Sequence, residues 1–113
     1  MHELGLMQAV RELALEQART HGATQIAAIT LRIGSLAGVE TEALRLAHTV
    51  VMAGTAAEGS CLQIEVVPAQ FACAPCQQPF AAVQGDCLCP RCGTFSQRLL
   101  QGRELELSSL ELS

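Results

Sequence analysis

Lysine, tryptophan and tyrosine are absent from this 113-residue chain, and only seven arginines supply its positive charge. The arginines are scattered along the sequence, and the net charge is −4. Binding to a phosphate backbone needs a basic stripe, and base stacking needs exposed aromatic rings, so these absences argue against nucleic acid as a partner. No uninterrupted apolar run reaches the roughly 18 residues that could span a bilayer, so we expect no membrane association.

The sequence also has no pattern typical of a secretory signal. It opens Met1-His2-Glu3, with an acidic residue and no basic region followed by an apolar core. We therefore expect a cytoplasmic protein, in which thiols stay reduced. Six cysteines in such a chain, four of them in two C-x-x-C pairs, favour metal thiolates over disulfides.

The periodicity of apolar residues predicts a small mixed α and β domain. Apolar spacings of three and four alternate along the chain with stretches rich in β-branched residues or strictly alternating in polarity. The last alternating stretch is too short to be ordered alone, so we expect it to pair beside the strand that precedes the cysteines. The predicted helices cover 4–21 and 43–54, and the predicted strands cover 24–33, 62–67 and 104–112.

Residues 68–98 differ abruptly from the rest of the chain. They hold five of the six cysteines, all four prolines and all three phenylalanines, which we expect to fill the interior of a metal-centred unit. The sequence thus predicts an α+β fold. We expect a small domain with two helices and a three-stranded mixed sheet, residues 1–67 and 99–113, to carry an inserted four-cysteine, zinc-ribbon-like domain at 68–98.

The two C-x-x-C pairs predict a closed metal cage. Four thiolates form the tetrahedral set that structural zinc prefers, and a filled sphere leaves no position for substrate or water. Twelve residues separate the pairs, enough for a hairpin that brings one over the other. The expected zinc ligands are Cys73, Cys76, Cys89 and Cys92.

Two further thiols leave alternatives open. Cys87 competes with Cys89 for the cage, but only Cys89 has the two-residue spacing to Cys92. We interpret Cys61 and Cys87 as small, semi-buried thiols without a role. Rubredoxin-like iron would require a more crowded aromatic core, and thioredoxin-like redox chemistry would require a βαβ context around a single C-x-x-C pair.

The first residues offer a second and chemically different metal site. The amine of Met1, the amide of residue 2 and the imidazole of His2 can form adjoining chelate rings, and Glu3 can add a fourth donor through its amide or carboxylate. Such a nitrogen set suits square-planar Ni(II). A histidine at position 2 is, however, usually only an exposed residue before a helix. His21 is expected to interact with a helix C-terminus, and His48 to be a surface or half-buried residue.

Several short motifs are spread along the sequence: Met1-His2-Glu3-Leu4, Arg32-Ile33-Gly34-Ser35-Leu36, Gly38-Val39-Glu40, Gly54-Thr55-Ala56, Cys73-x-x-Cys76, Cys89-Pro90-x-Cys92-Gly93 and Gly102-x-Glu104-Leu105. With these motifs the sequence closely resembles the HypA/HybF family of hydrogenase-maturation nickel metallochaperones, over essentially the whole chain. The departures are Cys87 beside the cage and Gln77 in place of a glycine that often follows the first cysteine pair.

The resemblance implies a non-enzymatic protein that holds Ni(II) through Met1, His2 and Glu3, with Glu40 as a second-rank ligand, and builds a structural Zn(II) domain on the four cysteines. It implies delivery of nickel to a [NiFe]-hydrogenase large subunit precursor with a HypB-type GTPase, by a monomer or homodimer. The main alternative is a zinc-ribbon adaptor that binds protein or nucleic acid and whose N-terminus is incidental.

Overall fold

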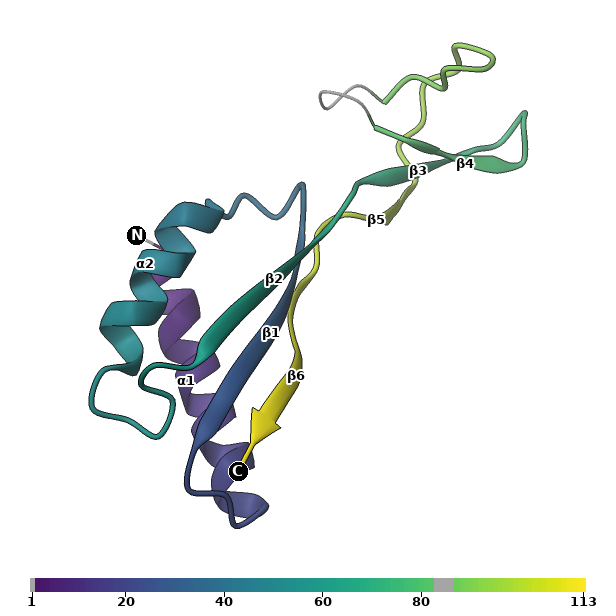
Figure 1. Ribbon diagram of the computed structural model, residues 1–113. Helices are drawn as coiled ribbons and strands as arrows, with labels where there is room; N and C mark the ends of the chain where they lie inside the picture. Colours follow the sequence, from purple (N-terminus) through teal and green to yellow (C-terminus); the bar gives the residue numbers. More distant parts are fainter. Residues whose placement is uncertain (1, 83–86) are drawn as a thin grey trace. The chain divides into compact units, whose positions relative to one another are not determined.

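The computed structural model describes residues 2–82 and 87–113, which form two helices and two three-stranded sheets (Figure 1). The α+β class predicted from the sequence is confirmed. The chain divides into two compact units. The helical unit comprises residues 1–32, 39–65 and 106–113, and the cysteine unit comprises 33–38 and 66–105. Neither helix in the described part of the chain is long and apolar enough to cross a membrane.

Helix α1 spans His2–Thr20 and helix α2 spans Thr41–Met52, and the two pack against each other in the helical unit. Gly22 follows the end of helix α1, and its positive φ of 67° allows the N–H of Ala23 to donate to Ala18 O at 2.8 Å. The spacings of three and four that predicted the helices correspond to their buried faces. The buried residues are Met7, Val10, Ala14 and Ala18 on α1, and Leu44, Ala47, His48, Val51 and Met52 on α2.

The larger sheet contains β1 (Ile26–Gly34), β2 (Cys61–Val67) and β6 (Leu105–Leu112) in the order β2-β1-β6. Hydrogen bonds at both ends of β1 show that β6 runs antiparallel to it: Gly34 N–H donates to Glu104 O at 2.8 Å, and Ser113 N–H donates to Gln25 O at 2.9 Å. Strand β2 follows α2 and runs in the same direction as β1 (Figure 1). The sheet is therefore mixed.

The expected position of the last strand was wrong, because β6 pairs with β1 and not with β2. Strand β1 is buried at most of its positions, whereas β2 and β6 are exposed at many of theirs. A strand covered on both faces belongs in the middle of a sheet, and half-exposed strands belong at its margins. The central place of β1 leaves one edge for β2 and the other for β6.

The smaller sheet lies in the cysteine unit and is antiparallel throughout, in the order β4-β3-β5. Its strands are β3 (Gln70–Cys73), β4 (Gln78–Ala81) and β5 (Leu99–Gln101). Phe71 and Phe80 face each other across β3 and β4, with ring centroids 5.9 Å apart, and both are buried beside the cysteines. Phe95 is 59% exposed, so only two of the three phenylalanines fill this interior as expected.

The backbone at the end of β1 lies so close to a neighbouring segment that adding one methyl group there is expected to lower the stability of the fold. A Cβ at Gly34 would lie 2.1 Å from the backbone oxygen of Gly102, and a backbone atom cannot shift as cheaply as the end of a flexible side chain. We expect Gly34→Ala to lower the free energy of unfolding by about 3 kcal/mol, the upper range for overpacking. Gly5→Ala is the matched control, because a Cβ there meets nothing within 4 Å. In helix α1 it should stabilise by up to about 1 kcal/mol. Urea denaturation measures both, and equal stability of the two variants would contradict the contact.

Candidate functional site

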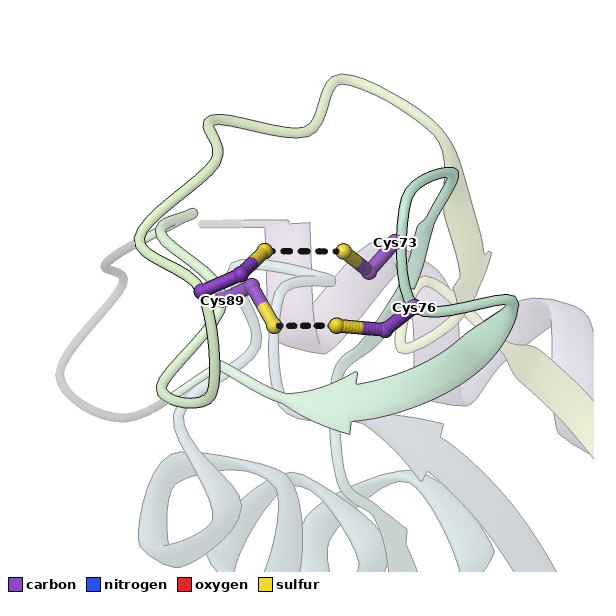
Figure 2. Close-up of side chains that lie close together, drawn as sticks. Cys73, Cys76 and Cys89 are labelled. Carbon is purple, nitrogen blue, oxygen red and sulfur yellow. Dashed lines mark hydrogen bonds between the residues drawn. The ribbon is translucent and has the colours of Figure 1, made fainter.

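The four predicted cysteines form one cluster, in which all four Sγ atoms lie within 4.8 Å of one another. The sulfur atoms of Cys73 and Cys92 are 3.5 Å apart, and those of Cys76 and Cys89 are 4.0 Å apart (Figure 2). Sulfur atoms bound to one zinc ion at about 2.3 Å in a tetrahedron are about 3.8 Å from each other. The spacing of the cluster therefore fits a single tetrahedral ion of the size of zinc.

Two tight turns place these sulfurs. After Cys73, at the end of β3, the chain reverses so that the N–H of Gln77 donates to Cys73 O at 2.8 Å before β4 begins. After Cys89, the N–H of Gly93 donates to Cys89 O at 2.7 Å, and the positive φ of 76° suits glycine. Gln77 has a φ of 53°, which is rarer for a residue with a Cβ. The glycine that Gln77 replaces would adopt this conformation at lower cost.

Cys87 lies outside the four-sulfur cluster, although it is close in sequence to Cys89. It packs against the buried cluster that includes Phe71, and its carbonyl accepts a hydrogen bond from Ser96 N–H at 2.9 Å. Cys87 is half-buried as expected, but Cys61 is exposed at the start of β2, contrary to the expectation for that thiol. The geometry thus favours Cys89 over Cys87 as the fourth sulfur.

The surroundings of the cluster favour thiolates at some sulfurs and thiols at others. The Thr94 hydroxyl, 3.2 Å from Cys92 Sγ, and the Thr94 backbone amide lower the pKa of Cys92 to about 6. Burial disfavours the thiolate of Cys89. Hydrogen bonds from the backbone amides of Arg91 and Cys92 favour it more strongly, so the pKa of Cys89 is lowered. At Cys73, the Cys76 backbone amide favours the thiolate, but burial and hydrogen bonds with the other three sulfurs raise its pKa to about 12. Thiolate charge therefore concentrates on the second C-x-x-C pair.

Arg91 supplies a positive charge beside the cage. Its guanidinium donates to Pro79 O at 3.1 Å, and a hydrogen bond with Cys76 raises the pKa of Arg91. A four-thiolate zinc centre carries a charge of about −2, which a neighbouring cation offsets. Sequence reasoning missed Arg91 and Thr94, although both stand within two residues of Cys92 in the second pair.

The start of α1 carries the second candidate site. Met1 lies outside the described residues. The side chain of His2 is 65% exposed, and its Nε2 is 3.6 Å from the Glu3 carboxylate. Helix α1 begins at His2, so the backbone N–H groups of His2 and Glu3 belong to the first turn, where α-helices have no internal acceptors. An accessible imidazole therefore adjoins amides that no helical hydrogen bond occupies.

A contact with the start of α2 brings Glu40 to the same place. The backbone N–H of Glu40 donates to Glu3 Oε2 at 3.1 Å, and this bond lowers the pKa of Glu3. The carboxylate of Glu40 accepts from Glu42 N–H at 2.9 Å and caps helix α2. Both carboxylates thus have structural roles at the junction of the helices. Sequence reasoning placed Glu40 near the site but did not foresee this backbone bond.

The other two histidines, His21 and His48, have structural roles that do not involve the start of α1. His21 Nδ1 is 2.8 Å from Gln17 O in the last turn of α1, as the expected helix C-terminal interaction requires. His48 is buried, not half-buried or at the surface, and its Nε2 is 2.9 Å from Ser60 Oγ. Burial and then the charge of Arg45 lower its pKa. His48 is therefore a neutral core residue with a satisfied ring nitrogen.

Comparison with known proteins gives consistent matches over nearly the whole chain. Residues 1–112 match the family model described as "Hydrogenase/urease nickel incorporation, metallochaperone, hypA". The chain is 44% identical over 112 residues to the hydrogenase maturation factor HypA of Acidithiobacillus ferrooxidans, covering 99% of each sequence. It is 36% identical over 111 residues to the hydrogenase maturation factor HybF of Klebsiella pneumoniae, covering 98% of each.

Solved structures share the fold. The solution structure of the Ni metallochaperone HypA from Helicobacter pylori superposes with a TM-score of 0.69 at 20% identity, covering 97% of this chain and 96% of that one. A second solution structure, of a HypA protein, gives a TM-score of 0.71 at 23% identity, with coverage of 100% and 97%.

Proposed function

Because the chain belongs to the HypA family of nickel metallochaperones, non-enzymatic proteins that serve hydrogenase maturation, we propose that it binds Ni(II) at its own N-terminus. It then passes the ion to a [NiFe]-hydrogenase large subunit precursor. The observation that carries this proposal is the exposed His2 at the first turn of α1, next to amides without helical partners. The four-cysteine cluster is closed and so cannot exchange cargo.

The proposed nickel donors are the amine of Met1, the amide and imidazole of His2, and a donor from Glu3. The Glu3 carboxylate already accepts the N–H of Glu40, which favours the Glu3 amide as the fourth nitrogen. Glu40 stays a second-rank ligand, since its carboxylate would have to leave the cap of α2 to reach the ion. Four nitrogens in a plane suit the d-electron preference of Ni(II).

The proposed metal of the cage is Zn(II), held by Cys73, Cys76, Cys89 and Cys92 in a structural role. The sulfur spacing and the thiolate-stabilising contacts at the second pair support this assignment. When bound, zinc supplies the crosslink that a unit with only two buried aromatic rings needs. We place this zinc domain at residues 68–98, inserted into a nickel domain at 1–67 and 99–113.

The proposed setting is the cytoplasm, where the free cysteines stay reduced. A HypB-type GTPase is the proposed partner in nickel transfer, and the protein acts as a monomer or homodimer. The family membership supports this partner class.

The two proposed metals should leave the protein at different pH values. Nickel is held by an amine with an ordinary pKa near 8 and by amides that bind only when deprotonated, so protons compete for its ligands first. A coordinating thiol is deprotonated by its metal, so bound zinc would hold all four thiolates, including that of Cys73, whose pKa without metal is raised to about 12. At Cys92 the thiolate is already favoured without metal, because the pKa of this thiol is about 6. Its folded-state pKa is depressed, and its stabilising contribution is lost as pH falls through about 6. In a pH titration, square-planar nickel absorption should disappear before a chromogenic chelator detects zinc. Simultaneous release would contradict the separation.

A genetic test addresses the function itself. A bacterium that lacks its own HypA-family protein should regain hydrogenase activity when it expresses this chain, and should not with His2→Ala. Excess nickel in the medium should restore hydrogenase activity in the bacterium that expresses neither the unaltered chain nor the variant, because free nickel ions then reach the hydrogenase without a metallochaperone. His21→Ala is the matched control for the loss of an imidazole and should behave as the unaltered chain, since His21 contacts Gln17 O at the end of α1 and is not a proposed nickel donor. If excess nickel failed while the chain succeeded, its role would not be nickel supply.

A further inference from the structure

The outer edge of β6 is used by neither proposed metal site. Strand β6 stands at the margin of the β2-β1-β6 sheet, and the described part of the chain provides no strand beyond it (Figure 1). Its eight residues, Leu105–Leu112, make it a long edge strand. Such an edge presents backbone N–H and C=O groups to any extended segment that approaches.

An apolar groove of about 670 Å³ runs beside this edge, between β6 and helix α1. Leu13 contributes from the helix and is 56% exposed, which is more than a leucine inside a well-covered core would be. Alternate side chains of an added strand could enter the groove while its backbone pairs with β6. The groove is lined mainly by Leu13, Gln17, His21, Leu107, Leu110 and Leu112.

The charges around the groove select a basic occupant. Glu106 and Glu111 belong to β6 but do not line the groove, and Arg32 is 3.3 Å from Glu106. Within the described residues no cation forms an ion pair with Glu111. The helical unit as a whole holds nine of the eleven acidic residues but only four of the seven arginines. An incoming strand with basic side chains would therefore meet complementary charge.

A second copy of the chain fits this edge poorly. If two β6 strands paired antiparallel in full register, residues equidistant from the centre between Ser108 and Ser109 would face each other. Glu106 of one copy would then face Glu111 of the other, and this would happen twice. Directly opposed like charges destabilise a strand pair, and the chain has no lysine to relieve them. Edge glutamates are a known device against self-association.

We propose that the β6 edge and its groove bind an extended segment of a partner protein in which apolar and basic side chains alternate. The backbone of the segment adds a strand to the sheet. Leu107 and Leu110 both line the groove, so the alternation of β6 shifts by one residue at Ser108-Ser109, and Glu106 and Glu111 both fall outside the groove. The apolar side chains of the segment occupy the groove beside Leu13, and its basic side chains reach Glu106 and Glu111. This inference does not depend on nickel binding at His2.

The probe is an octapeptide of alternating arginine and valine, acetylated, amidated and fluorescently labelled, titrated against the whole zinc-loaded protein. Binding should be accompanied by new hydrogen-exchange protection in Leu105–Leu112. Leu13→Gln should weaken binding about fivefold through lost apolar contact, whereas Leu46→Gln, at an exposed leucine on α2 outside the groove, should not. Glu111→Gln should weaken it about threefold, whereas Glu12→Gln on α1 should not.

The decisive control is the same peptide methylated on every backbone nitrogen. It keeps the charge and the side chains but cannot pair as a strand, so it should fail to bind. Equal binding of the methylated peptide would mean simple charge attraction and would overturn the proposal. Protection of β6 that increases with protein concentration and without peptide would identify a second copy as the occupant, and would overturn it as well.

Discussion

Replacing Cys89 with serine is expected to unfold the cysteine unit while the helical unit stays folded. Cys89 is 1% exposed and belongs both to the four-sulfur cluster and to the small core with Phe71 and Phe80. Structural zinc contributes on the order of 10 kcal/mol to such units, far more than so small an apolar cluster can replace. Loss of one thiolate leaves an incomplete ligand sphere and a buried hydroxyl in an apolar place.

NMR spectra of the amides measure this outcome for each unit separately. In Cys89→Ser the resonances of β3, β4 and β5 should collapse toward random-coil positions, and zinc analysis should show less than one ion per chain. The resonances of α1, α2 and β1 should keep their dispersion. Cys61→Ser is the matched control, because Cys61 is exposed and outside the cluster. Unfolding of both units together would contradict the proposed independence of the inserted domain.

The sequence was most informative where structure depends on local spacing. The helices follow from apolar residues three and four apart, and observed bounds of 2–20 and 41–52 lie close to the predicted 4–21 and 43–54. The four-sulfur cluster follows from two C-x-x-C pairs, because a two-residue spacing is fixed by one tight turn. Both inferences need only neighbours in the chain.

Non-local pairing was harder to predict, for a physical reason. The alternation of Leu105–Leu112 identifies a strand but does not say which edge it joins, and that is decided by the burial of β1 on both faces. The contact of Glu3 with the backbone of Glu40 joins residues 37 positions apart and leaves no pattern in the sequence. Phe95 likewise resembles Phe71 and Phe80 in the sequence, yet it lies outside their stacked pair.

Adding a single residue before Met1, or acetylating its amine, is expected to abolish nickel binding as completely as His2→Ala does. The amine closes one chelate ring and the imidazole the other, so the loss of either donor opens the site. We expect at least about a hundredfold loss of affinity, since even residues that only support metal ligands cost tenfold to a hundredfold.

The helix at this terminus makes the prediction sharper. The first-turn N–H groups of His2 and Glu3 have no helical acceptors, so nickel can replace their protons without breaking a helical hydrogen bond. A cation would ordinarily be disfavoured at the positive end of α1, but each deprotonated amide brings a compensating negative charge. The site therefore needs these nitrogens and cannot be replaced by an imidazole elsewhere on the helix. Titration monitored by square-planar absorption should show uptake by the unaltered chain and by His21→Ala, with unchanged zinc content in every variant. Uptake of nickel by the acetylated protein would show that the ion is held elsewhere.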